Sequence, residues 1–133
     1  MKFSEKEHRQ LSLWAALCAE HVLKYFEKKY PADKRPRIAI EAAREWSRGK
    51  IKVTEARNAA LAAHSAARDT TDKMAQFAAR AAGHAAATAH VATHSPHAAG
   101  YARKTTDIAG LVEERDWQIQ HLPANLRKKI FPV

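Results

Sequence analysis

Apolar positions recur at helical spacing along most of the chain. Over residues 4–30 they share one face of a helix, at Leu11, Trp14, Ala15, Cys18, Val22, Tyr25 and Phe26. Ser4 followed three residues later by Glu7 has the form of a capping box, and Pro31 ends the segment. No stretch shows the alternation of polar and β-branched residues that is typical of a strand. The pattern predicts an all-α fold.

The same reasoning predicts further helices, which give a bundle of five or six in all. We expect them over residues 36–48, 55–68, 72–93, 96–109 and 111–121. Gly49 is expected to end the first of these helices, and Thr54 and Asp72 to cap the second and third. Ser95 as a cap followed by Pro96 predicts a corner between two helices, and Gly110 a break after the next one. The last ten or so residues are expected to form one helical turn and a loose tail.

Alanine makes up roughly a fifth of the 133 residues. Small side chains let two helix axes approach to roughly 8 Å, so the helices over 55–68 and 72–93 are expected to form a closely packed central pair. Bulky residues are expected to cover this pair, namely Trp14, Phe26, Trp46, Trp117 and Phe131. A chain of this length fits one hydrophobic core, so we expect a single helical domain, residues 1–133.

The net charge of +9 is compatible with nucleic acid, an acidic membrane surface or an acidic protein as partner. The cations are spread along the chain, which favours a basic surface without a special role, or a protein partner, over nucleic acid. Cys18 lies on the apolar face and is expected in the core, and a single cysteine fits the reducing cytoplasm. Neither the charged N-terminus nor the alanine–histidine segment 81–102 has the apolar residues of a signal or a membrane span. We expect a cytoplasmic protein with no membrane partner.

Four histidines, at positions 84, 90, 94 and 97, concentrate near the predicted corner. A metal would require His90 and His94 one helical turn apart and a third ligand such as His64. No HExxH glutamate or nearby cysteine accompanies them, so we predict no metal and no cofactor, with His64, His90 and His94 as the weak candidate ligands. The competing interpretation places His84 and His90 partly buried and neutral, with His94 and His97 solvated. Buried neutral imidazoles would make the fold less stable below about pH 6.

Sequence signatures of catalysis are lacking. The chain contains no GxSxG elbow, phosphate-binding loop or dinucleotide fingerprint, so we predict that it is not an enzyme and has no catalytic residues. Several arginines lie beside the alanine positions, at 44, 57, 68, 80 and 103. Each either pairs with a carboxylate such as Glu41, Glu45 or Glu55 or projects into a groove.

Three blocks between Pro36 and Pro123 carry a family resemblance. They are EAAREWSRG, AALAAHSAAR and AARAAGHAAATAHV, followed by ERDWQIQHLP in the same order. The segment 36–123 resembles the alanine-rich, all-helical immunity proteins of bacterial toxin–immunity systems. The matching positions are Arg44, Glu45, Trp46, Arg57, His64, Arg68, Arg80, His84, His90, Trp117 and His121.

The resemblance implies a non-catalytic protein that binds and neutralises a cognate bacterial toxin. The matching polar positions are then candidate partner-binding residues, while Trp46 is expected to be structural. A basic helical nucleic-acid-binding protein is the alternative, because of the net charge of +9. A histidine-based metal-binding protein is a third hypothesis. An acidic toxin surface would suit a chain of this charge.

Overall fold

The computed structural model describes residues 2–132, and over this range the chain consists of helices and turns without a strand. The predicted all-α fold is therefore confirmed. The elements are α1 (Glu5–Val22), α2 (Lys24–Glu27), α3 (Arg35–Ser47), α4 (Val53–Arg68), α5 (Lys73–Ala87), α6 (His94–Arg103), α7 (Ile108–His121), the 3₁₀ helix η1 (Ala124–Leu126) and α8 (Arg127–Ile130). No helix in this range is both long enough and apolar enough to cross a membrane.

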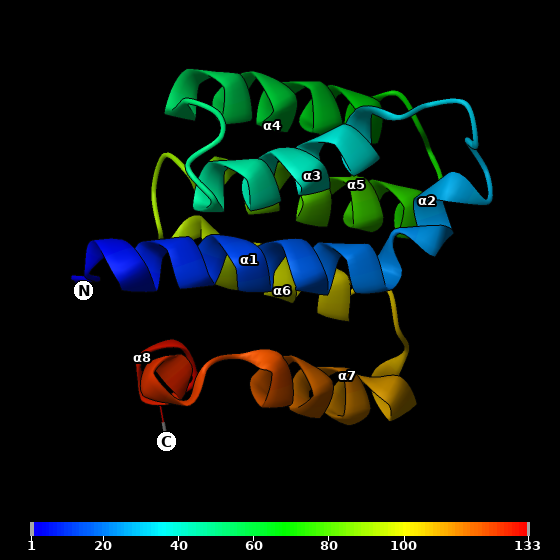
Figure 1. Cartoon of the computed structure of the whole chain (residues 1–133). Helices are drawn as coiled ribbons and strands as arrows, with labels where there is room; N and C mark the ends of the chain where they lie inside the picture. The colour runs from blue at the N-terminus through cyan, green and yellow to red at the C-terminus, as the bar shows by residue number, and fades with distance from the viewer. Residues whose placement is uncertain (1, 133) are drawn as a thin grey trace.

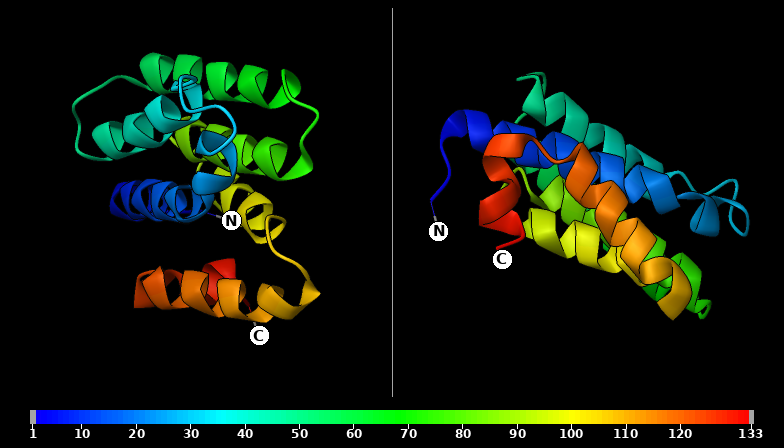
Figure 2. Two further views of the ribbon diagram at one scale, coloured as in Figure 1. Left: turned by 90° about the vertical axis from the view of Figure 1, so that its right-hand side faces the viewer. Right: turned by 90° about the horizontal axis from the view of Figure 1, so that it is seen from below.

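The helices stack in layers. Figures 1 and 2 show α4 on one side, then α3 beside α5, then α1 beside α6, and finally α7 with α8. Helix α5 is central, because it contacts α1, α2, α3, α4 and α6. The close pairing of α4 with α5 agrees with the prediction from alanine content. The expectation that both are central is wrong for α4, which packs mainly on α3 and α5 and forms an outer layer.

Alanine fills the interior. Sixteen of the buried residues in α4, α5 and α6 are alanines or the single glycine, so neighbouring backbones can lie close together. Trp14 and Phe26 are buried as expected, and the ring of Phe131 packs edge-on against Trp14 at 6.0 Å. Trp46 and Trp117 are only half-buried. Cys18 is fully buried, and burial raises the pKa of its thiol, so it behaves as a small core residue.

Local sequence signals locate most helix ends. The Ser4 side chain accepts from the Glu7 backbone N–H and Glu7 accepts from the Ser4 backbone N–H, so the predicted capping box is confirmed. Asp72 caps α5 by accepting from the Ala75 backbone N–H. Gly49 follows α3 with a φ of 74°, a left-handed conformation in which glycine is favoured.

Other predicted boundaries are wrong. The first helix is interrupted at Leu23, which separates α1 from α2. Thr54 is not a cap, because α4 starts at Val53 and its N-cap residue is Lys52. Helix α6 begins at His94, so Ser95 and Pro96 form its first turn, although the predicted corner is present. Gly110 does not break a helix. Its backbone N–H donates to Asp107, which caps α7.

The largest error concerns the end of α5. The helix stops at Ala87 instead of Thr93, and residues 88–93 form a turn. The Thr88 hydroxyl donates to the carbonyl of His84, and the Thr88 carbonyl accepts from His8 Nε2 in α1. The contact with His8 satisfies a carbonyl that the end of the helix leaves without an intrahelical partner.

Candidate functional site

The predicted site residues lie in several separate parts of the structure. His64, Arg68, Arg80 and His84 lie together along α4 and α5, where His94 of α6 joins them. Trp117 and His121 lie on α7 and face α1. Arg44 on α3 is apart from both groups, and Arg57 and His90 are exposed elsewhere.

The first group contains a histidine cluster made of His64, His84, His94 and His97. His84 is at its centre, with ring centroids 4.9 Å from His64, 5.2 Å from His94 and 5.4 Å from His97. The Nδ1 atoms of His84 and His94 are 3.0 Å apart, so one ring donates and the other accepts. Tyr101 stacks on His84 at 5.3 Å with an interplanar angle of 10°. The cluster therefore joins α4, α5 and α6.

Burial keeps the two inner histidines neutral. Desolvation, followed by the charge of Arg80, lowers the pKa of His64 to about 4. Desolvation and the neighbouring His64 lower the pKa of His84 to about 3. The pKa of His94 is also lowered, mainly by burial. A neutral His64 is what the geometry requires, because its Nδ1 accepts from Arg80 Nη1 at 2.9 Å.

The half-buried state predicted for His84 agrees with this geometry, whereas the prediction for His90 is wrong. His90 is exposed in the turn after α5, and within residues 2–132 it makes no ring contact with the cluster. His94 is half-buried instead of solvated, and His97 is exposed as expected. The physical reason is the early end of α5, which removes His90 and His94 from the common helix that would place them one turn apart.

Gly83 makes the position of His64 possible. A Cβ atom on Gly83 would lie 2.6 Å from Cε1, 2.7 Å from Nε2 and 2.8 Å from Nδ1 of the His64 ring. Contacts this short are essentially absent from proteins, so the imidazole occupies the space that a side chain at position 83 would need. A glycine inside a helix costs about 1 kcal/mol relative to alanine. Here the ring contact with α5 accounts for that glycine.

A groove borders the cluster on its solvent side. It is lined by Ala67, Arg68, Gln76, Phe77, Arg80 and Tyr101, has a volume of about 530 Å³, and is called the cationic groove below. The ammonium of Lys104 lies 5.6 Å from the Phe77 centroid and 4.8 Å from the Tyr101 centroid, as in cation–π contacts. Two aromatic rings and two arginines thus line one concave surface, with Lys104 at its rim. Lys104 was not identified from the sequence. Its position continues the helical spacing of His94, His97 and Tyr101, and this spacing is the signal that could have identified it.

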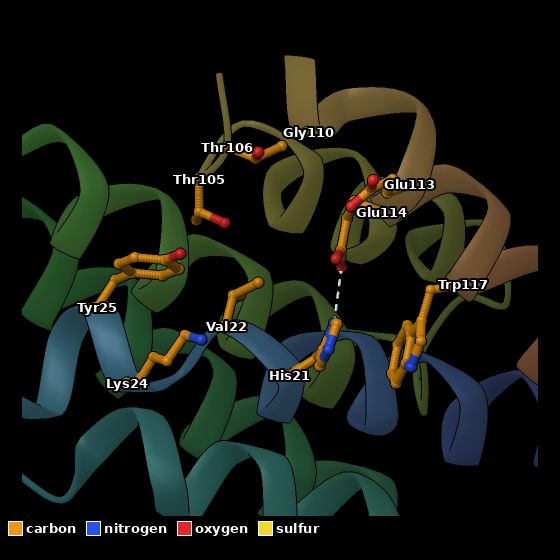
Figure 3. A pocket seen from close by; sticks show the side chains of 10 residues that line it. All are labelled: His21, Val22, Lys24, Tyr25, Thr105, Thr106, Gly110, Glu113, Glu114 and Trp117. Carbon is orange, nitrogen blue, oxygen red and sulfur yellow. Dashed lines mark hydrogen bonds and ion pairs between the residues drawn. The ribbon is translucent and has the colours of Figure 1, made fainter. Parts of the chain in front are cut away.

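A second pocket of about 290 Å³ separates α1 and α2 from α7 (Figure 3). His21 and Glu114 point toward each other across it, and His21 Nδ1 donates to Glu114 Oε1 at 3.0 Å. The Trp117 indole lies between two imidazoles, with His21 stacked at 3.7 Å and His121 at 4.2 Å. His121 Nδ1 donates to the Trp117 carbonyl at 2.8 Å. These contacts hold the polar face of α7 against α1.

Buried polar contacts complete the attachment of α7. The Trp14 indole N–H donates to the Gln118 carbonyl at 2.8 Å. The fully buried side chain of Gln118 donates to the Ala99 carbonyl and accepts from Arg103 Nη1. Burial lowers the pKa of Arg103. Sequence reasoning identified Trp117 and His121 but not His21 or Glu114, since those contacts join residues about ninety positions apart.

Arg44 behaves as a structural residue. Its guanidinium makes a two-pronged contact with Glu20 of α1, at 2.8 and 3.0 Å, and a third bond to Glu41 at 2.6 Å. The Arg44 side chain is only 17% exposed, and these contacts raise its pKa. The predicted pairing with Glu41 is confirmed, and it is extended to α1. Arg57 instead borders a small depression with Thr54, Asn58 and Leu61.

A metal site does not form from the predicted ligands. Within the described part of the chain, no group of three or more histidine, cysteine, aspartate or glutamate side chains is arranged to hold a metal ion. His64 and His94 both lie near His84, but His90 is exposed in the turn after α5.

The chain is a small all-α protein with an alanine-rich core, and its clusters of polar side chains border open surface grooves. A family model described as "Imm-5 like putative immunity protein" matches residues 1–125. The chain therefore belongs to this family, and the resemblance seen over residues 36–123 is confirmed and extends toward both ends. Membership implies a protein partner, a toxin, for the family in general. No curated protein and no solved structure matches the chain.

Proposed function

We propose that this chain is a non-catalytic immunity protein that binds and neutralises a cognate bacterial toxin in the cytoplasm. The observation that carries the proposal is the family match over residues 1–125. The fold is compatible with this role. Alanine-rich packing leaves little internal freedom, so a partner meets a preorganised surface and little ordering entropy is lost on binding.

A growth experiment tests the proposal directly. The toxin encoded beside the gene for this chain is expressed with and without the chain in the same bacterial host. We expect growth arrest with the toxin alone, growth when both are present, and a complex of the two proteins on gel filtration. Arrest that persists despite abundant folded chain, together with no complex, would contradict the proposal.

Stoichiometry separates binding from catalysis. If the chain acts by occupying the toxin, residual toxin activity falls linearly with added chain and reaches zero at equivalence. An enzyme that modified the toxin would inactivate it with time at far lower amounts. Complete protection at one chain per ten toxin molecules would exclude the binding mechanism.

The nucleic-acid hypothesis stays a prediction with its own measurement. Binding of this kind weakens steeply with salt, because each neutralised phosphate releases a counterion. Affinity for bulk duplex DNA that falls by several orders of magnitude between low and high salt would favour it. Zinc that stays bound after dialysis would likewise favour the histidine-based hypothesis.

A further inference from the structure

We infer that the cationic groove, together with Lys104 at its rim, is the surface that binds an acidic, aromatic-containing segment of the toxin. This inference rests on the proposed function and specifies which surface and which chemistry carry it. Four observations support it: the unpaired cations, the aromatic floor, the fixed arginine and the size of the groove.

The cations of the groove differ from four arginines elsewhere in the described chain, because they lie close together without a carboxylate partner. Arg9, Arg35, Arg37 and Arg44 each form an ion pair with a carboxylate. Within residues 2–132, Arg68 and Arg80, which line the groove, and Lys104, which lies over its two rings, form no ion pair. Like charges that gather without counter-charge repel each other, and a bound anion relieves that repulsion.

The aromatic floor adds an apolar contact. Phe77 and Tyr101 lie 6.4 Å apart between centroids and are both half-buried, so each keeps part of a ring face open to the groove. Tyr101 is fixed from behind by its stack on His84. Ring faces next to cations suit a ligand that combines carboxylates with an aromatic or apolar side chain.

Arg80 is held in place before any ligand arrives. One of its guanidinium nitrogens donates to His64, and the other side faces the groove. His64 itself packs against Gly83 and is kept neutral by burial. The hydrogen bond to His64 therefore positions the Arg80 guanidinium without neutralising its positive charge. A positioned guanidinium loses less side-chain entropy on binding than a free one. Its five N–H donors also match the two oxygens of a carboxylate.

The size of the groove and its missing counter-charge suit a short acidic segment. Its volume of about 530 Å³ falls within the range of about 300–1,000 Å³ that is typical of ligand sites. Asp69 and Asp72 lie where α4 ends and α5 begins, and Asp107 lines the depression on the other side of Lys104. Asp69 and Asp72 are already paired with Arg35 and Lys29, so these two carboxylates near the groove in sequence do not balance the charge of its cations.

Matched charge-reversal variants test the inference. In one double variant, Arg68→Glu and Lys104→Glu reverse two exposed cations of the groove. In the control, Arg48→Glu and Lys128→Glu reverse two exposed cations elsewhere and change the net charge by the same amount. We expect the groove variant to weaken binding of the neighbouring toxin by about 10- to 100-fold, and the control by less than about threefold. Circular dichroism and thermal melting confirm that both variants are folded.

A second variant separates charge from orientation. Arg80→Gln keeps an N–H donor for His64 while removing the cation, so the fold is maintained and binding should still fall about tenfold. Equal toxin binding by the wild type, the groove double variant and Arg80→Gln would overturn the groove inference while leaving the proposed function intact.

Peptide and oligonucleotide probes make the ligand chemistry testable without the toxin. The probes are a fluorescein-labelled peptide of alternating glutamate and tyrosine, its glutamine counterpart, and an oligothymidylate of the same length. We expect the glutamate peptide to bind most tightly and to lose affinity in the groove variant. If the toxin fails to bind but this peptide binds through the groove, the acidic-ligand site stands and the proposed function falls. Tighter groove-dependent binding of the oligothymidylate, or no binding of the glutamate peptide or toxin, would overturn the inference.

Discussion

Replacing Gly83 with alanine tests whether the His64 ring occupies the space left by the glycine. In an ordinary helix interior, Gly→Ala stabilises by about 1 kcal/mol, because alanine loses less backbone entropy on folding. Here the new methyl group would lie 2.6 Å from the nearest His64 ring atom, so the imidazole must move away. The sign of the effect therefore depends on whether His64 is present.

The magnitude follows from what the displaced ring would lose. Its hydrogen bond with Arg80 at 2.9 Å contributes about 0.5–1.5 kcal/mol net. Its edge contact with His84 at 4.9 Å contributes about 0.5–1.5 kcal/mol more. Against a helix gain of about 1 kcal/mol, we expect Gly83→Ala to destabilise the wild type by about 1 kcal/mol. In a His64→Ala background only the gain remains, so the same substitution should stabilise by about 1 kcal/mol.

A double-mutant cycle measures this change of sign. Urea unfolding of the wild type, the two single variants and the double variant is followed by circular dichroism at pH 7.5, and a coupling energy of about 2 kcal/mol is expected. If Gly83→Ala stabilises both backgrounds by the same amount, the ring does not occupy the space beside Gly83 and the reasoning fails. A similar m-value for all four proteins is the control for two-state unfolding.

The remaining predictions concern pH, α7 and an ion pair. The pKa values of His64 and His84 in the folded protein are about 4 and about 3, whereas a histidine in the unfolded chain has a pKa of about 6.5. Their contribution to the free energy of unfolding is therefore complete above pH 6.5 and is lost on acidification. After allowance for partial solvent screening, we expect about 1 kcal/mol lost per ring between pH 7.5 and 5, measured by urea midpoints. An unchanged midpoint, or the same loss after both are replaced by glutamine, would contradict this. Trp117→Ala removes stacking on two imidazoles and should cost about 1–3 kcal/mol, with faster amide hydrogen exchange in α7 than in α5. Arg44→Ala should lower the free energy of unfolding by about 1–2 kcal/mol and Arg57→Ala by less than about 0.5 kcal/mol, measured by urea unfolding. Equal losses would refute the structural role of the ion pair between Arg44 and Glu20 of α1.

Sequence information was sufficient where a structural feature depends on neighbouring residues. The capping box of Ser4 and Glu7, the Asp72 cap and the left-handed Gly49 each involve residues within a few positions, and each is present. The apolar periodicity predicted every long helix, because one buried face is enough to reveal the helical repeat. Fold class therefore followed from local rules.

Long-range contacts could not be predicted from these local rules. Helix α5 ends where His8, eighty positions away, holds the Thr88 carbonyl, and nothing in the residues around Thr88 signals that contact. The error then spread to the histidines, since a longer helix placed His90 and His94 on one face. The candidate site was anticipated in part, because His64, Arg68, Arg80 and His84 do lie together. Lys104 joins them only because α6 folds back along α5, which periodicity does not predict.

The alanine core and the cationic groove are two consequences of the same packing. When α4 and α5 meet through alanines, their backbones lie so close that longer side chains at the edges of the contact must extend along the surface. His64 does so across Gly83, and Arg80 follows it into the groove. Ala63→Leu should disturb both, since Ala63 is fully buried and the added methyl groups would cost about 1–3 kcal/mol by pushing the helices apart. A wider gap should also make room for a methyl group on Gly83, so the penalty of Gly83→Ala should shrink in the Ala63→Leu background. Leu61→Ala, at an exposed position of the same helix, is the matched control and should leave both stability and that penalty nearly unchanged. An undiminished penalty in the Ala63→Leu protein would show that helix spacing does not position the His64 ring.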